Sequence, residues 1–176
     1  MSVVIFIVGE LLTLMLFVVL LRLLLQWSRA DFRNPISQAV VRITNPLVMP
    51  LRRILPPVGK IDTASVVAVL LVALVEVAIL ATLRGFELPP LAWLRDALLE
   101  IARTLLRTYL YAIILYALLS LIAPGGYSPV QSLLTSLCEP VLRPIRRLTP
   151  PRWFGGLDLS PLWACILIQA VLLLLP

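Results

Sequence analysis

The sequence predicts an all-α polytopic membrane protein with four transmembrane helices, organised as two parallel repeats. First, 61% of its 176 residues are hydrophobic and only 14% are charged, whereas soluble domains carry about 25% charged residues. Second, four apolar windows, at residues 3–25, 63–83, 105–123 and 159–175, are long enough to cross a hydrocarbon core of about 30 Å. Third, a Pro/Arg motif occurs twice, once between the two windows of each pair.

The motif is an internal repeat. Residues 35–57 align without gaps to residues 129–151, and the seven identical positions are all Pro or Arg. A repeated pattern of this kind marks a repeated structural unit, so we divide the chain into residues 1–86 and 87–176. The repeated residues are the prolines Pro35, Pro46, Pro50, Pro56 and Pro57 with Pro129, Pro140, Pro144, Pro150 and Pro151, and the arginine pairs Arg52–Arg53 and Arg146–Arg147.

A short interfacial helix is predicted at the start of each motif region, residues 34–62 and 128–158. Asn34 and Ser128 each stand before a proline. Asn or Ser at the N-cap, with Pro at the first helical position, is typical of a helix start. A helix of about ten residues is too short to span, so we expect it to lie in the cytoplasmic interface. A shallow re-entrant dip is the alternative.

The prolines inside the motif are predicted to stop these short helices. The residue before a proline avoids the α region, and proline itself lacks an amide donor. Pro46 is therefore expected to end the first helix, and Pro50 to keep the following segment kinked or extended. Pro140 and Pro144 predict the same arrangement in the second copy.

Asp62 and Asp158 are each predicted to N-cap the span that follows, at residues 63–83 and 159–175. Because the repeat relates the two residues, a dyad of the aspartyl-protease type is the alternative. The cap explains both copies without any chemistry, and we prefer it.

One long helix is predicted to join an outer amphipathic segment to the third span, over residues 91–123. Apolar residues recur at helical spacing from Leu91, and charged residues form a stripe from Asp96 to Arg107. No helix-breaking residue occurs before Pro124.

The distribution of positive charge predicts the orientation. Six Lys and Arg residues follow the first span and four follow the third, against four between the second and third spans. Cytoplasmic loops carry the excess of positive charge, so both motif regions are predicted to be cytoplasmic and both termini periplasmic. Arg22, at the inner end of the first span, is expected to extend toward the head groups.

The residue types limit the chemistry. The chain has no His, which excludes His-ligated haem, HExxH zinc sites and His proton relays. Cys138 and Cys165 lack metal-binding spacing and are interpreted as reduced packing residues. With no phosphate loop and no nucleophile beside a base, we predict no catalytic residue, no metal and no cofactor. The net charge of +6 is attributed to membrane topology, not to binding of nucleic acid.

Polar residues inside the apolar windows are candidates for a functional site, and they are Glu10, Glu76 and Gln169. A carboxylate within a span is a functional-site hypothesis by default, and proton or cation coupling is one interpretation. A buried structural hydrogen bond is the second, with Thr82, Arg84 or Gln169 as the partner of Glu76. Simple exposure at the membrane surface is the third.

The motif arginines are candidates for binding anionic lipid head groups or a partner protein. Each Lys or Arg near the surface attracts anionic lipid by about 1 kcal/mol. Setting the topology and extending toward the head groups are the alternative uses of these side chains. The candidate set is Arg52, Arg53, Arg146 and Arg147, with Arg42 and Arg143.

The two-copy arrangement of Asn-Pro-Ile or Ser-Pro-Val, the P-x3-P-x-R-R-x2-P-P motif and Gly-x-[Ile/Leu]-Asp resembles the YggT family, called YlmG in Gram-positive bacteria. The resemblance covers nearly the whole chain and includes the two copies of proteobacterial members. Gly59-Lys60 and Ala64 depart from the double glycine and serine of the family pattern.

The resemblance implies a multi-pass protein of the bacterial inner membrane without an agreed molecular activity. Bacterial members are associated with osmotic-stress tolerance and division gene neighbourhoods, and chloroplast relatives with cytochrome complex assembly and nucleoid distribution. We therefore expect a non-enzymatic scaffold or assembly factor whose partners are anionic lipids and a membrane protein or further copies of itself. The alternative is a small oligomeric ion channel or transporter that uses Glu76 and Glu10.

Overall fold

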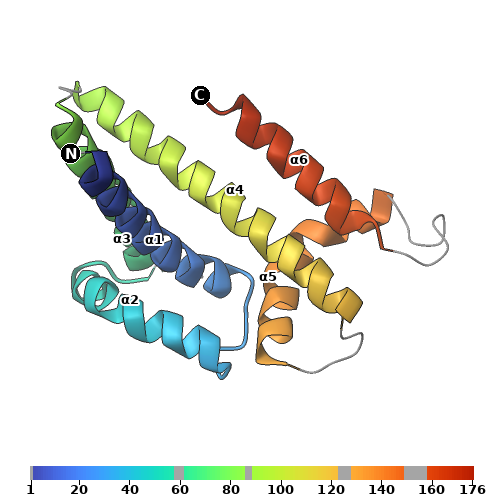
Figure 1. Ribbon diagram of the computed structural model, residues 1–176. Coiled ribbons are helices and arrows are strands. Elements are labelled where there is room, and N and C mark those ends of the chain that lie inside the picture. Colours follow the sequence, from blue (N-terminus) through green and yellow to red (C-terminus); the bar gives the residue numbers. More distant parts are fainter. Residues whose placement is uncertain (1, 58–61, 86–88, 123–127, 149–157) are drawn as a thin grey trace. The chain divides into compact units, whose positions relative to one another are not determined.

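The described residues form six helices and no strand. The computed structural model describes residues 2–57, 62–85, 89–122, 128–148 and 158–176, and Figure 1 shows its helices in chain order. The motif prolines Pro150 and Pro151 and the motif glycines Gly59, Gly155 and Gly156 lie outside the described residues. The helices are α1 (Ser2–Trp27), α2 (Pro35–Ile54), α3 (Thr63–Arg84), α4 (Pro90–Ile122), α5 (Pro129–Leu148) and α6 (Ser160–Leu174).

Three of the described helices, α1, α3 and α4, are long and apolar enough to cross a membrane. The fourth predicted span corresponds to α6, which is apolar but has only 15 residues. At about 1.5 Å per residue this helix is about 22 Å long, shorter than a hydrocarbon core of about 30 Å. The all-helical fold is therefore confirmed, with three helices long and apolar enough to span a membrane, while the arrangement of four spans in two repeats stays a prediction.

The prediction that the motif prolines end the interfacial helices was wrong. α2 continues through Pro46 and Pro50, and α5 continues through Pro140 and Pro144. A proline inside a helix removes one hydrogen bond and pushes on the carbonyl four residues earlier, which bends a helix without always stopping it. The ribbon of α5 changes direction along its length (Figure 1).

The four prolines are tolerated because they lie on exposed faces. All four are exposed, so the carbonyls that lose a helical donor can be hydrated. The opposite face supplies the packing. In α2 it carries the buried residues Ser37, Val40, Thr44 and Val48, and in α5 it carries Leu133, Leu134, Leu137, Cys138 and Leu142.

Two other predictions about helix boundaries are confirmed. Ser128 caps α5, since its Oγ accepts a hydrogen bond of 3.1 Å from the Gln131 amide, and Asn34 Oδ1 accepts one of 2.9 Å from the Ile36 amide at the start of α2. The long outer helix is also as expected, because α4 runs unbroken from Pro90 to Ile122.

The chain divides into two compact units. The first contains residues 1–23 and 40–105. In it α1 and α3 pack antiparallel: Thr13 bonds Glu76, and a Cβ added to Gly9 would lie 3.5 Å from Leu80. Small side chains such as Ala64 and Ala68 are fully buried on α3, as is common where membrane helices approach closely.

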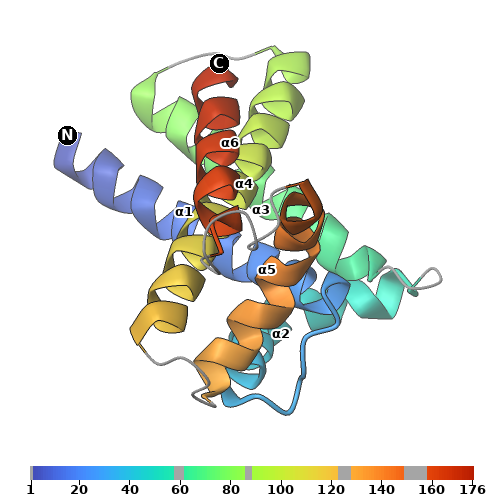
Figure 2. The same ribbon diagram turned by 90° about the vertical axis from the view of Figure 1, so that its right-hand side faces the viewer.

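The second unit contains residues 24–39 and 106–176. Its helices α5 and α6, both labelled in Figure 2, contact one another. The start of α2 is attached to the start of α5, because Asn34 Nδ2 donates to the Pro129 carbonyl at 2.6 Å. Each unit thus contains the arginine pair and the aspartate of one motif.

Candidate functional site

In the first motif, Arg52 binds Asp62. The guanidinium donates from Nη2 to Oδ2 and from Nε to Oδ1 at 3.4 Å, and Ser65 Oγ donates to Oδ2 at 2.7 Å. Asp62 is buried with 3% of its side chain exposed, while Arg52 is 42% exposed. The pair therefore ties the end of α2 to the start of α3.

These contacts set the charge of Asp62. Burial acts to raise its pKa, but the hydrogen bonds from Arg52 and Ser65 outweigh burial, and the pKa lies below the ordinary aspartate value. Asp62 occupies the N-cap position of α3 as predicted, yet its side chain makes no hydrogen bond to the first helical amides. Its carboxylate forms the ion pair with Arg52 instead.

The sequence did not predict a structural role for a second arginine in this unit, Arg22 of α1. The sequence predicted that it extends toward the head groups, but it is 3% exposed. Its Nη1 donates to Thr44 Oγ1 at 2.8 Å and to Asn45 Oδ1 at 3.0 Å. An Asn beside the first motif proline is the only sequence signal that pointed to such a partner.

In the second motif, Arg146 bonds three acceptors. Nε donates to Asp158 Oδ2 at 2.8 Å, Nη1 to Glu139 Oε2 at 2.9 Å and Nη2 to Tyr116 Oη at 3.2 Å. Asp158 also accepts bonds from the amide, at 3.0 Å, and the hydroxyl of Ser160. Asp158 thus contacts the start of α6 from one residue before its N-cap, Leu159.

The second site is also an ion pair, and the pKa values of both partners are shifted. Burial acts to raise the Asp158 pKa, and the bonds from Ser160 and Arg146 outweigh it, so the pKa lies below the usual range. Burial alone would lower the Arg146 pKa, but the contacts with Tyr116 and Asp158 raise it. Both groups are therefore fully charged at neutral pH.

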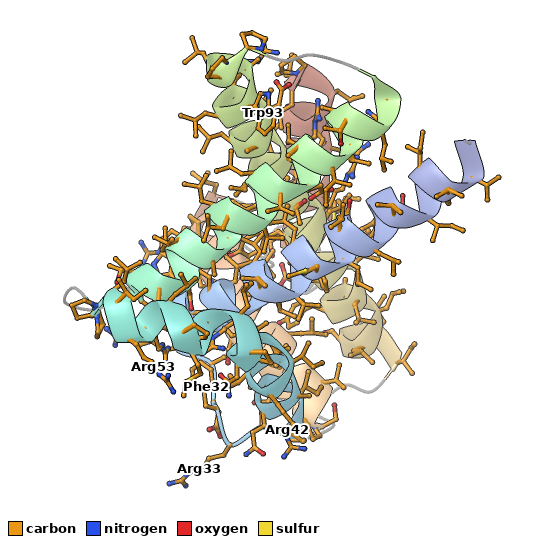
Figure 3. The ribbon with its side chains drawn as sticks, turned by 90° about the vertical axis from the view of Figure 1, so that its left-hand side faces the viewer. Phe32, Arg33, Arg42, Arg53 and Trp93 are labelled. Carbon is orange, nitrogen blue, oxygen red and sulfur yellow. The ribbon has the colours of Figure 1, made fainter. Side chains whose placement is uncertain are left out.

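The other members of the arginine set are directed outward. Arg53 and Arg147, the second residues of the two pairs, are exposed, and so is Arg42. Arg143 is 69% exposed and lies 3.9 Å from Glu139. Arg42 and Arg53 project away from α2 in Figure 3, which also labels Arg33 and Phe32 before that helix and Trp93 on α4.

The predicted intramembrane polar residues have different environments. Glu10 and Gln169 are exposed, whereas Glu76 is 2% exposed. Glu76 bonds Thr13, whose Oγ1 donates to Oε1 at 2.7 Å. The predicted partners were therefore wrong: Thr82 instead bonds the backbone carbonyls of its own helix.

No group of three His, Cys, Asp or Glu residues with the geometry of a metal site occurs within the described residues. Cys138 is buried, and burial together with the nearby Cys165 raises its pKa to about 12. A thiol in this state is not a reactive nucleophile, in agreement with a packing role. The arrangement as a whole can bind anions at exposed arginines and can hold a carboxyl group inside the first unit.

Long apolar helices, two proline-containing amphipathic helices and an ion pair at each motif define a helical membrane protein with a duplicated motif. A family model for CCB3/YggT matches residues 1–83 and 95–176. The chain belongs to the CCB3/YggT family.

Curated relatives of the chain agree with this assignment. A protein of Pseudomonas aeruginosa described as uncharacterised is 40% identical over 95% of this chain and 85% of its own length. A protein of Escherichia coli K12, named uncharacterised protein YggT, is 34% identical over 94% of this chain and 85% of its own length. A Vibrio alginolyticus protein is 39% identical over 93% and 88%. No solved structure matches the chain significantly.

Proposed function

We propose that the protein is a non-enzymatic scaffold or assembly factor of the bacterial inner membrane that binds anionic phospholipid head groups. The observation that carries the proposal is that the two arginines of each pair have different environments. Arg52 and Arg146 are held in ion pairs with Asp62 and Asp158, while the neighbouring Arg53 and Arg147 are exposed and form no ion pair with the described residues. The motif thus builds a fixed frame and leaves one cation per copy for a ligand.

The exposed side of α2 has the composition of a lipid-binding surface. Arg42, Pro46, Pro50 and Arg53 recur at near four-residue spacing and are all exposed, so they share one side of the helix. Ile43 and Ile54 are 67% and 76% exposed next to these arginines. A helix with basic and apolar groups on its outer surface is typical of the membrane interface.

Proline supplies a further reason for head groups to bind here. Pro46 and Pro50 cannot donate to the carbonyls of Arg42 and Pro46, so two acceptors on this side lack a helical donor. Phosphatidylglycerol carries a phosphate that pairs with arginine and hydroxyls that donate to carbonyls. Its head group therefore fits both features of the surface.

The cellular role follows from the family resemblance. We place the motif regions in the cytoplasm and both termini in the periplasm, and we expect the lipid-bound face to hold a membrane-protein partner or further copies of the chain. We expect cells whose protein lacks the exposed arginines to show altered osmotic-stress tolerance or altered organisation of the membrane at division.

Native mass spectrometry of the purified protein tests the proposal by comparing phosphatidylglycerol with phosphatidylcholine. The double variant Arg53→Gln/Arg147→Gln is expected to bind phosphatidylglycerol about fivefold more weakly at each copy of the motif, because each surface cation contributes about 1 kcal/mol. Its thermal stability is expected to stay unchanged. The matched control is Arg95→Gln, an exposed arginine that pairs with Asp96 at 2.9 Å and is expected to have little effect.

Unchanged selectivity for phosphatidylglycerol in the double variant contradicts the proposal. If lipid binding is unchanged but a cross-linked protein disappears with Arg53 and Arg147, the surface belongs to a protein partner instead. Normal salt tolerance of cells that carry the double variant would separate the lipid site from the cellular role.

A second candidate is a small oligomeric ion channel or transporter, favoured by the buried carboxyl of Glu76 and by the nearby exposed Glu10. Ion flux in proteoliposomes tests it, with Glu76→Gln as the control. Flux that depends on Glu76 supports a transport function, and its absence from folded protein leaves the scaffold as the better proposal.

A further inference from the structure

Glu76 is a buried carboxyl group that is only half satisfied. Its Oε1 accepts the hydrogen bond from Thr13, but its Oε2 is buried and has no hydrogen-bond partner among the described residues. The side chain as a whole is 2% exposed. An ionised carboxylate in this position is costly, because its charge is buried and one of its two oxygens lacks a hydrogen-bond donor.

The packing of α3 directs Glu76 toward protein. Ala64, Ala68, Val72 and Glu76 occur every four residues and are all buried, so they form one stripe along the helix. The contact of Thr13 with Glu76 continues the antiparallel register in which Gly9 lies opposite Leu80. Glu76 therefore lies between packed helices and not against lipid.

The charges around Glu76 are mainly negative. Glu10 of α1 and Glu100 of α4 both lie close enough to repel an ionised Glu76. Arg103 of α4, which bonds Glu100 at 3.4 Å, is held by that carboxylate, and no ion pair of Glu76 occurs among the described residues. An ionised Glu76 would thus have one hydroxyl donor and two carboxylate neighbours.

We propose that Glu76 is an intramembrane proton-binding site. The carboxylate and one proton form the neutral acid, which keeps the Thr13 bond at Oε1 and carries the proton on Oε2. The neutral form avoids the desolvation cost of a buried anion. This inference concerns proton binding alone and is independent of lipid binding at the arginines.

A metal cation fits the site less well than a proton. Hard cations take six or more oxygen ligands, whereas Glu76 bonds Thr13 and no group of three His, Cys, Asp or Glu residues able to hold a metal occurs in the described part of the chain. The second repeat also lacks the pair, since the position fourteen residues after Asp158 is Leu172 where Glu76 follows Asp62 by the same distance. The proton site is therefore a property of the first repeat alone.

Labelling with dicyclohexylcarbodiimide, which reacts with protonated carboxyl groups in apolar surroundings, tests the site on the full-length protein in liposomes. We expect one adduct on Glu76, found by peptide mass mapping, whose yield falls as the pH rises. Glu76→Gln is expected to abolish the adduct, and Glu10→Gln, which removes an exposed carboxylate, to retain it. No adduct on Glu76, or a yield independent of pH, overturns the proposal, as does suppression of the adduct by sodium at constant ionic strength.

Infrared spectroscopy tests the proposal even if the Glu76→Gln variant fails to fold. Wild-type protein is expected to show the carbonyl stretch of a protonated carboxylic acid. Thr13→Val, which keeps the carboxyl but removes its donor, is expected to shift this band to higher frequency. If neither protein shows a protonated carboxyl band at neutral pH, Glu76 is ionised and the inference fails.

Discussion

The two copies of the motif use the same arginine and aspartate but surround them differently. The offset that aligns Pro35 with Pro129 also aligns Arg52 with Arg146, and each of these arginines binds the aspartate of its own copy. The same offset aligns Arg22 with Tyr116 and Asn45 with Glu139. These two positions supply the neighbours that differ.

The residue differences at these two positions change the charge around the Arg–Asp ion pair but leave the pair itself in place. In the first copy, Arg22 bonds the neutral Asn45, and the charges of Arg52 and Asp62 both act on Arg22. In the second copy, the corresponding phenol of Tyr116 and carboxylate of Glu139 both accept from Arg146. The first aspartate thus has two nearby arginines, and the second arginine serves two carboxylates.

The comparison teaches that the Arg–Asp pair is the constant part of the motif. Its surroundings differ in charge, because the cation lost at position 116 and the anion gained at position 139 both make the second site more negative than the first. This difference predicts unequal consequences for the same substitution in the two copies.

Replacing Arg146 by Gln is expected to have the largest effect on stability. Asp158, Glu139 and Tyr116 would lose their shared donor, and two carboxylates would face one another. Allowing for partial exposure, we expect a loss of about 2–3 kcal/mol in the free energy of unfolding. Arg52→Gln is expected to cost about half of this, because Ser65 and Arg22 still act on Asp62. Unfolding of both variants in detergent, followed by circular dichroism, checks the order, and equal losses would contradict the comparison.

Substituting Arg22 by Tyr should make the first copy behave like the second. Arg22 acts on Asp62 through its charge alone, so without Arg22 the pair with Arg52 is the remaining favourable charge contact of Asp62 in the described residues. Arg52→Gln is then expected to cost about 1 kcal/mol more than in the wild-type background, as a coupling energy in a double-mutant cycle. Arg22→Tyr with Asn45→Glu, which restores the second-copy set, is the matched control and should recover part of the stability. Additive losses would show that Arg22 does not share the first site.

The helices were largely predictable because long apolar runs and N-cap residues are local signals. α1, α3 and α4 lie close to the predicted windows, and Ser128 caps its helix as expected. The continuity of α2 and α5 was not predictable from proline alone. It depends on a buried face that packs and an exposed face that hydrates the freed carbonyls, and the sequence does not show which face is buried.

The site was predictable only as a list of residues. The repeat singled out the arginine pairs and the aspartates, and the structure joins one arginine of each pair to its aspartate. That Arg22 is buried, or that Thr13 bonds Glu76 across 63 positions in the chain, depends on helix register. Such long-range contacts leave no local pattern.

Acid is expected to reveal a smaller difference between the two aspartates. Both have a pKa below the ordinary value, so each ion pair adds stability at neutral pH, and this contribution is lost as the pH falls below about 4 toward the folded-state pKa. Asp62 is 3% exposed and Asp158 is 33% exposed, so solvent screens the second pair more. Thermal unfolding as a function of pH should show that Asp62→Asn removes more of the acid-dependent loss than Asp158→Asn. If the two variants have the same pH profile, burial does not distinguish the two aspartates.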